Sequence, residues 1–375
     1  MSSDVMRAWA YLSRVAEPPC PLLTALIARD GVAAAAEQVR QGRVSGELLR
    51  QTDARREIDC AEDDLATVQR LGGRLVTMDD DEWPLLSFVA FGGDEVRRRP
   101  QGHAPMALWV RGEVRLDDVT ARAAAIVGTR AASAYGEHVA ADLAAGLVAR
   151  DVAVVSGGAF GIDGTAHRAA LACDGLTVAV LAGGVDVPYP AGHSALLGRI
   201  AKEGLLISEY PPGMRPTRVR FLTRNRLVAA LAGATVVVEA GVRSGAANTA
   251  GWAEALGRVV CAVPGPVTSA VSMGCHSLIR GGANLVGRAE EVVELIGRAG
   301  ELAPDEVRPV TALDGLGDAE RRVYEALPAR AARSADEIAV AAGIPAYQVL
   351  GPLAMLEVAG LVVHREGRWT LGARR

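Results

Sequence analysis

The feature that most constrains the fold is a regular alternation of short apolar runs with amphipathic stretches, which begins near residue 105. The apolar runs lie at residues 123–128, 152–156, 177–182, 205–208, 235–240 and 259–263. Between the first two runs, Val139, Leu143 and Leu147 are spaced four residues apart, which places them on one face of a helix. Continuous apolar strands that alternate with such helices indicate a parallel sheet covered on both faces. In a sheet of this kind, ligands bind at the carboxyl ends of the strands.

Other segments flank this alternation. Within residues 1–72, short helices are predicted near residues 5–15, 21–29, 31–40 and 55–71. After a proline-containing linker near residue 304, three helices and a two-stranded hairpin are predicted within residues 310–375. Ser334 and Glu337 form a capping box that starts the second of these helices. Three helices followed by a hairpin are typical of a winged helix.

Positive charge in this chain must act locally, because the formal net charge is −4 and no general basic field surrounds the molecule. Any anion site must therefore be a local concentration of arginine. Lys202 is the only lysine, and it lies in RIAKEGLL, outside any phosphate loop of the G-x-x-x-x-G-K-[ST] type. This position argues against ATP hydrolysis by a P-loop and against Schiff-base chemistry.

The cysteine pattern and the hydropathy indicate a cytoplasmic protein. The five cysteines are scattered and form no C-x-x-C pair, which is expected for reduced thiols and argues against a disulfide framework or a zinc knuckle. No apolar run approaches the roughly 18 residues needed to cross a bilayer. The first residues lack the basic-then-apolar order of a secretory signal.

Two glycine-containing segments follow expected strands. The segment IVGTR, at residues 126–130, carries Arg130 past the end of its strand, where an anion would lie. The segment SGGAFGID, at residues 156–163, frees backbone N–H groups that can surround an anionic oxygen, and a helix begins behind it. It is not a G-x-G-x-x-G motif, so a dinucleotide dehydrogenase fits poorly. Asp163 is interpreted as the helix N-cap and His167 as a locally bonded residue on the helix.

The densest positive charge lies in RPTRVRFLTRNR, at residues 215–226, which holds five arginines and no acid around Phe221. Guanidinium groups bind phosphates bidentately, and an exposed aromatic ring can stack on a base. We interpret this segment as a loop that binds single-stranded nucleic acid; the alternative is a network of salt bridges with acidic helices. A further strand end at residues 239–245 leads through Asn248 and Thr249 into a helix and adds donors for phosphate oxygens. No catalytic triad, zinc motif or nucleophile elbow is found, so the pattern favours a binding protein.

In order along the chain, these segments resemble the motifs of the DprA family, also called Smf, the DNA-processing proteins of bacterial natural transformation. The family pattern includes I-V-G-[ST]-R, V-S-G-x-A-x-G-I-D-x-x-A-H, S-E-Y-P-x-G and F-x-x-R-N-R. The matching segments are residues 126–130, 155–167, 184–190, 208–213, 221–226, 237–250, 260–265 and 278–283.

The resemblance implies an extended Rossmann-like core at residues 73–300, between a helical domain of the SAM or helix–hairpin–helix kind at residues 1–72 and a winged helix at residues 310–375. It implies a cytoplasmic homodimer that binds single-stranded DNA, protects it and loads the RecA recombinase onto it, without enzymatic activity, cofactor, metal or membrane. Carried over by motif, the expected DNA-binding residues are Arg130, Ser156, Gly157, Gly158, Phe160, Gly161, Arg218, Phe221, Arg224, Asn225, Arg226, Ser244 and Gly245.

The expected winged helix is not basic. Residues 305–375 hold nine arginines against ten acids, and the recognition helix AYQVLGPLAMLEVA has no basic residue. A protein that reads duplex DNA normally presents a basic face. We therefore expect this domain to contact a protein, or to contact DNA only weakly through His364, Arg365 and Arg368.

Two other functions are compatible with parts of the sequence. Phosphoribohydrolases of the LOG type have a similar core with a P-G-G-x-G-T-x-x-E loop; this chain lacks that loop but retains Glu239, which keeps a nucleotide-hydrolysing or nucleotide-binding role conceivable. A winged-helix transcription factor with a ligand-sensing core is the other alternative, and the acidic final domain argues against it.

Overall fold

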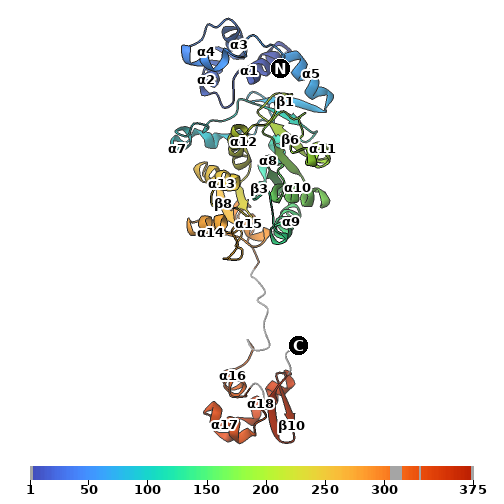
Figure 1. Cartoon of the computed structure of the whole chain (residues 1–375), viewed down its shortest axis with the longest axis vertical. Coiled ribbons are helices and arrows are strands. Elements are labelled where there is room, and N and C mark those ends of the chain that lie inside the picture. Colours follow the sequence, from blue (N-terminus) through green and yellow to red (C-terminus); the bar gives the residue numbers. More distant parts are fainter. Residues whose placement is uncertain (1–2, 305–314, 329–330, 373–375) are drawn as a thin grey trace. The chain divides into compact units, whose positions relative to one another are not determined.

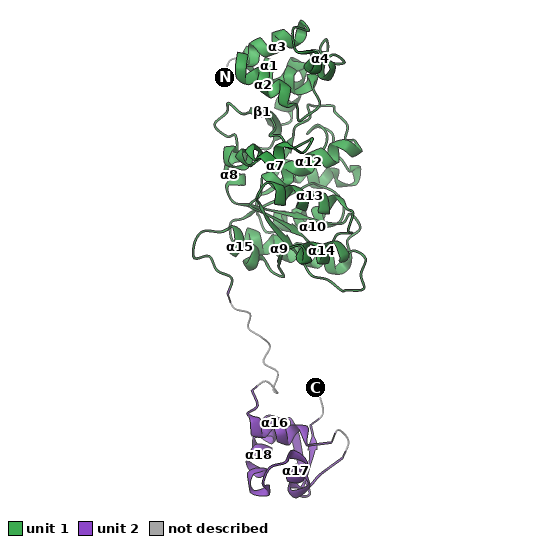
Figure 2. Ribbon diagram, turned by 90° about the vertical axis from the view of Figure 1, so that its left-hand side faces the viewer, with its two compact units in different colours: residues 1–303 green, residues 304–375 purple. Residues whose placement is uncertain are grey.

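The computed structural model describes residues 3–304, 315–328 and 331–372. It divides the chain into two compact units, Met1–Ala303 and Pro304–Arg375 (Figure 2). The start of the expected winged helix, residues 310–314, lies outside the described residues. Each unit is described separately below.

The first unit is built on a mixed sheet that is mostly parallel, with nine strands among the described residues (Figure 1). Their order is β1-β2-β6-β5-β4-β3-β7-β8-β9. The seven strands from β6 to β9 run parallel, whereas β1 and β2 are antiparallel additions at one edge. The strands are β1 Gly73–Thr77, β2 Ala107–Arg111, β3 Ala123–Val127, β4 Ala153–Ser156, β5 Thr177–Val180, β6 Leu205–Ser208, β7 Ala234–Val237, β8 Val259–Ala262 and β9 Asn284–Leu285. The six apolar runs correspond to β3–β8, so the predicted α/β Rossmann-like class is confirmed.

Helices cover both faces of the sheet because alternate strand residues point in opposite directions. From β3, Ala124 and Ile126 pack with one group of helices, and Ala125 and Val127 pack with the other. The first group is α9 Ala134–Val148, α10 Ile162–Ala172 and α15 Ala289–Ile296. The second group is α8 Leu116–Ala121, α12 Arg218–Ala230, α13 Gly245–Ala255 and α14 Met273–Arg280. Helix α11, Ser194–Glu203, packs near β5 and β6.

The N-terminal helices share a hydrophobic core with the sheet. Trp9 and Leu12 are buried in the same cluster as Trp109 of β2 and Leu206 of β6. The helices are α1 Ser3–Val15, α2 Pro21–Asp30, α3 Val32–Arg40, α4 Gly46–Thr52 and α5 Ala61–Arg70. Helix α4 was not expected. The division at residue 72 stays a prediction, since helices and sheet lie in one compact unit.

The second unit has the predicted winged-helix arrangement. Its elements are α16 Asp318–Glu325, α17 Ala335–Ala342, the short 3-10 helix Ala346–Gln348, α18 Leu350–Val358, β10 Val362–Arg365 and β11 Arg368–Leu371. The capping box of Ser334 and Glu337 is formed at the start of α17. Glu366 and Gly367 both have positive φ, as a tight two-residue hairpin turn requires.

Among the described residues, no single helix is long and apolar enough to cross a membrane. One pair of helices, Ala335–Ala342 with Ala346–Val358, meets the criteria of length and composition when taken together. This pair is bent by 102° at the break between the two helices.

Candidate nucleic-acid interface

A cleft of about 800 Å³ opens at the carboxyl edge of the sheet in the first unit. The loops after β3 and β4 form its base, and α12 and the start of α13 contribute to its walls. Strand β3 pairs with β4 on one side and with β7 on the other, so the strand order reverses at this point. Ligands of open α/β sheets bind at such switch points.

Four arginines line the cleft: Arg130, Arg218, Arg224 and Arg243. Arg130, Arg218 and Arg243 are exposed, and within the described part of the chain none of them forms an ion pair. The carboxylate that lines the same cleft, Asp163, is buried. Guanidinium groups without a carboxylate partner are free to bind phosphate oxygens.

The arginine-rich segment is largely a helix, so the predicted loop is wrong. Helix α12 begins at Arg218, where the Oγ1 of Thr217 accepts the amide of Arg220 at 3.3 Å and caps the helix. Helical periodicity separates the side chains onto different faces. Arg218, Phe221 and Asn225 line the cleft.

Two arginines of this helix point away from the cleft. Arg220 pairs with Glu17, with 3.0 Å between Nη2 and Oε2. Arg226 has no exposed surface and binds both carboxylate oxygens of Glu209, at 2.7 Å between Nη2 and Oε1. Arg226 was expected to contact DNA, and this expectation is corrected: its side chain neutralises a buried carboxylate inside the fold. The alternative of a salt-bridge network therefore holds for these two residues.

Arg224 lies at the base of the cleft, where it is 5% exposed. Its Nη1 donates to the Val180 carbonyl at 2.8 Å, and its Nε is buried without a partner. Burial lowers the pKa of Arg224 to about 10; nearby Asp163 acts against the shift, and Arg130 adds to it. A Cβ at position 157 would lie 1.9 Å from the Arg224 Nη1, so Gly157 leaves room for the guanidinium.

The glycine-rich loop after β4 holds a carboxylate of the protein itself. Asp163 accepts the amides of Gly157 at 3.1 Å and Ala159 at 3.4 Å. The N-cap position of α10 is Gly161, so the interpretation of Asp163 as N-cap is wrong. Burial raises the pKa of Asp163, whereas Arg224 and the two amides favour its charged form. These two amides are consequently not available to a ligand.

The remaining predicted residues of this loop have different surroundings. Ser156 is fully buried and its hydroxyl donates to the Ile126 carbonyl at 2.6 Å, so the expectation that its side chain binds phosphate is corrected. Gly161 has φ +71, and a Cβ there would lie 2.3 Å from the Thr129 carbonyl oxygen. This glycine therefore lets the two loops of the cleft approach each other.

Phe160 and Gly158 both contact His193. The Phe160 ring is 46% exposed and meets the His193 ring edge-on at 4.6 Å. Gly158 is buried, with its carbonyl oxygen 3.1 Å from the Nδ1 of His193, which must donate to it. His167, on α10, is fully buried and its Nδ1 bonds the Thr177 hydroxyl at 2.7 Å, as expected for a locally bonded residue.

Aromatic rings and charge meet inside the cleft. The guanidinium of Arg130 lies 5.2 Å from the centre of the Phe221 ring, and the Tyr189 ring lies 5.4 Å from the same ring. Tyr189 is 45% exposed and was not predicted from the sequence. Binding sites for single-stranded nucleic acid typically combine partly exposed aromatic rings with nearby arginines.

The start of α13 forms the opposite wall. Ser244 caps this helix by accepting the Ala247 amide at 3.2 Å. Asn225 donates to the Gly245 carbonyl at 3.3 Å and thereby joins α12 to α13. Arg243, which sequence reasoning missed, stands directly before the cap and lines the cleft. Its position beside a helix N-terminus was the signal in the sequence, because both features attract anions.

Glu239 is used structurally. It is buried and accepts the amide of Ser133 at 2.9 Å and its hydroxyl at 2.5 Å, at the start of α9. A Cβ at Gly136 would lie 2.4 Å from the same carboxylate, so the space around it is filled. This arrangement disfavours a role in glycosidic hydrolysis. Within the described residues, no group of His, Cys, Asp and Glu could hold a metal ion.

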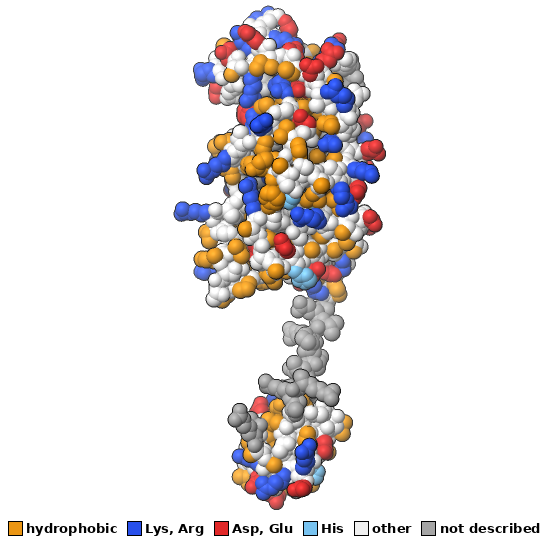
Figure 3. Space-filling model, turned by 45° about the vertical axis from the view of Figure 1, so that its right-hand side comes forward, with side chains coloured by type: hydrophobic (Ala, Val, Ile, Leu, Met, Phe, Trp, Pro, Cys, Tyr) orange, Lys and Arg blue, Asp and Glu red, His pale blue; other side chains and the backbone are white. Residues whose placement is uncertain are grey.

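On the face that Figure 3 shows, basic side chains are scattered among apolar ones over the first unit. They do not form one continuous patch on this face. On this face, positive charge is concentrated only locally, in keeping with the acidic net charge of the chain.

The fold and the cleft define a Rossmann-like α/β protein with an arginine-lined cleft, followed by a winged helix. The family model described as DNA recombination-mediator protein A matches residues 74–297, and that of the DprA winged helix domain matches residues 307–368. The chain belongs to this DprA/Smf family.

Curated relatives agree with this assignment. The chain is 67% identical over 371 residues to the putative DNA processing protein DprA of Mycobacterium tuberculosis, covering 99% of this chain and 95% of the relative. It is 37% identical over 265 residues to the protein Smf of Escherichia coli, covering 69% of each.

Solved structures give the same result. DNA processing protein A from Streptococcus pneumoniae superposes with a TM-score of 0.62 and 27% identity, covering 79% of this chain and 99% of that one. DNA processing protein A from Helicobacter pylori superposes with a TM-score of 0.50 and 26% identity, covering 59% of this chain and 94% of that one. That structure is described as giving insights into the unique single-stranded DNA binding mode of the H. pylori protein.

Proposed function

We propose that this chain binds single-stranded DNA in the cleft, protects the strand without cutting or modifying it, and loads the RecA recombinase onto it during DNA uptake and recombination. The observation that carries the DNA-binding part is the set of three exposed, unpaired guanidinium groups, those of Arg130, Arg218 and Arg243, in one cleft with exposed rings. The H. pylori relative, whose single-stranded DNA binding mode is known, supports it.

In this proposal each part of the cleft has a separate task. The exposed arginines contact phosphates, and Arg224 adds positive charge at the base of the cleft. Phe221 and Tyr189, which line the cleft, present ring faces to bases, and Phe160, exposed on the loop after β4, adds a further ring outside the cleft lining. Such stacking is tolerant of sequence because every base can stack. Phosphate contacts supply the affinity and make it dependent on salt.

The proposal also includes a homodimer that acts in the cytoplasm and needs no cofactor. The absence of catalytic activity is supported by Glu239, whose carboxylate is already bonded to Ser133, and by Asp163, whose carboxylate is bonded to two amides. The likeness to family members described as recombination mediators supports the transfer of DNA to a recombinase.

The first test measures fluorescence anisotropy of a labelled oligo-dT of a few tens of nucleotides, with duplex of the same length as a control. Tighter binding of the single strand, and weaker binding in Arg130→Ala and Arg218→Ala, are expected. Equal binding by the variants would contradict a site in the cleft. Release of free adenine from AMP would contradict the absence of catalysis and favour the hydrolase alternative.

The recombinase step has its own test. RecA filament growth on DNA coated with single-strand-binding protein is followed with and without the chain. Faster nucleation with the wild type and loss of that effect in Arg218→Ala are expected. Unchanged nucleation would remove the loading step from the proposal and leave DNA binding in place.

A further inference from the structure

A second pocket, of about 420 Å³, lies at the opposite edge of the sheet from the cleft. It is lined by residues at the amino ends of β3, β7 and β8, among them Ala123, Gly233 and Arg258. A ligand bound here would leave the DNA cleft open, because the two sites lie at opposite ends of the same strands.

The rim of this pocket exposes an unusual amount of apolar surface. Helix α6, Leu85–Phe88, and the short 3-10 helix after it, Val89–Gly92, carry Leu85, Leu86 and Val89, which are 65%, 85% and 65% exposed. The other side of the same segment buries Phe88 and Phe91 in the core. Large apolar side chains that gather on the surface around a pocket mark an interaction site.

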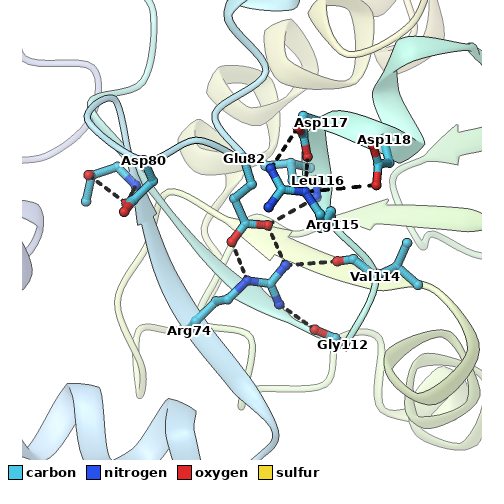
Figure 4. A network of polar contacts seen from close by, with 10 residues as sticks. Arg74, Asp80, Glu82, Gly112, Val114, Arg115, Leu116, Asp117 and Asp118 are labelled. Carbon is cyan, nitrogen blue, oxygen red and sulfur yellow. Dashed lines mark hydrogen bonds and ion pairs between the residues drawn. The ribbon is translucent and has the colours of Figure 1, made fainter. Parts of the chain in front are cut away.

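The residues just before this segment belong to a network of polar contacts (Figure 4). Glu82, next to the apolar rim, accepts Nη2 of Arg74 at 2.6 Å and the Leu116 amide at 3.2 Å. Although burial opposes it, these donors lower the pKa of the Glu82 carboxyl. Arg74 also donates to the carbonyls of Gly112 and Val114, at 2.6 and 2.9 Å. This network fixes the chain that leads into the apolar rim.

Positive charge without a counter-ion lines the same pocket. Arg258 donates to the carbonyls of Leu86 and Ser87, at 3.2 and 3.1 Å, and its Nε is buried without a partner. Within the described residues it forms no ion pair, and burial lowers its pKa. Arg122 also lines the pocket, but it has a counter-ion: its Nη1 and Nη2 pair with Glu301 at 3.1 Å, and only its Nε is buried without a partner. Asp117, the carboxylate lining the pocket, is already bonded to Arg115, as Figure 4 shows.

We propose that this pocket is a docking site for a partner protein, which inserts a short peptide segment carrying a carboxylate beside apolar side chains. The carboxylate would pair with Arg258, whose charge has no partner of its own, and the apolar side chains would cover Leu85 and Leu86. Charge complementarity selects an acidic segment over a basic one. The chain can in this way hold DNA at one edge of the sheet and a protein at the other.

The test selects peptides from a random 12-residue display library on the full chain. The selected peptides are expected to combine a carboxylate, from Asp, Glu or a free C-terminus, with apolar residues such as Leu, Ile, Phe or Met. Affinity of a labelled selected peptide is then measured by anisotropy. A fall of about tenfold or more is expected in Leu86→Asp and in Arg258→Gln, and for a peptide whose acids are replaced by amides.

Val267→Asp is the matched control, because Val267 is 86% exposed and lies at the cleft edge of the sheet rather than beside this pocket. Its affinity for the peptide is expected to equal that of the wild type. Leu86→Asp should bind oligo-dT normally, which separates this proposal from the DNA-binding one. Failure to select any peptide, selection of peptides without a carboxylate, or equal binding by Leu86→Asp and the wild type would overturn the docking site.

Discussion

Replacing Arg226 by methionine should lower the stability of the first unit and leave the side chains that line the cleft unchanged. The change leaves the Glu209 carboxylate, 4% exposed, without its counter-ion. Removing one partner of a buried ion pair costs about 3–5 kcal/mol. With an unfolding entropy of about 2.1 cal/mol/K per residue, the 303 residues of the unit give about 0.64 kcal/mol/K, so the melting temperature should fall by about 5–8 °C.

Thermal unfolding followed by circular dichroism measures this shift, with Arg218→Met as the matched variant on the same helix. Arg218 is exposed and unpaired, so its replacement should move the melting temperature by about 1 °C or less and weaken binding of oligo-dT. The double variant Arg226→Met, Glu209→Met removes both charges and should recover most of the lost stability. An Arg226→Met protein with unchanged melting temperature and lost DNA binding would refute the assignment of Arg226 to the interior.

Three further predictions concern the site and its supports. Gly157→Ala should displace the Arg224 guanidinium and weaken oligo-dT binding in anisotropy. The double variant Gly157→Ala, Arg224→Ala should bind no more weakly than Arg224→Ala alone, whereas additive losses of affinity would contradict an effect through Arg224. Burial lowers the pKa of His167 to about 3, so below its unfolded pKa of about 6.5 only the unfolded chain takes up the proton, and stability should fall by about 1 kcal/mol between pH 6.5 and 5.5. His167→Asn should remove this contribution in denaturant titrations. Deleting residues 305–375 should leave oligo-dT affinity within a few-fold, and a large loss would show that the acidic winged helix contributes to binding.

The sheet could be predicted from sequence because its central strands are buried on both faces and are therefore continuously apolar. Strand β3, for example, is AAAIV, all buried. The winged helix could also be predicted from sequence, because its capping box and hairpin turn are local signals. Helix α4 was missed because its seven residues are too few to show a period.

The contacts of the site could not be predicted because they depend on partners distant in the chain. Arg218 and Arg226 lie in the same arginine-rich segment and cannot be told apart from sequence. Only the fold shows that Arg226 is neutralised by Glu209. Asp163 had the position of an N-cap, but the loop folds back and supplies it with the amides of Gly157 and Ala159. The cap signal of Thr217 and a run of 13 residues without Gly or Pro could have identified α12 as a helix.

The salt dependence of oligo-dT binding tests the central claim most directly. For a single strand, each phosphate contact contributes about 0.7 to the magnitude of the slope of log K against log salt concentration. The three exposed arginines of the cleft should therefore contribute about 2.1 to this slope, which is a loss of about 20-fold in affinity between 50 and 200 mM salt. The account predicts that a variant with Arg130, Arg218 and Arg243 all changed to Gln binds more weakly with a slope smaller by about 2. An unchanged slope in that variant would show that the strand binds elsewhere and would contradict the account.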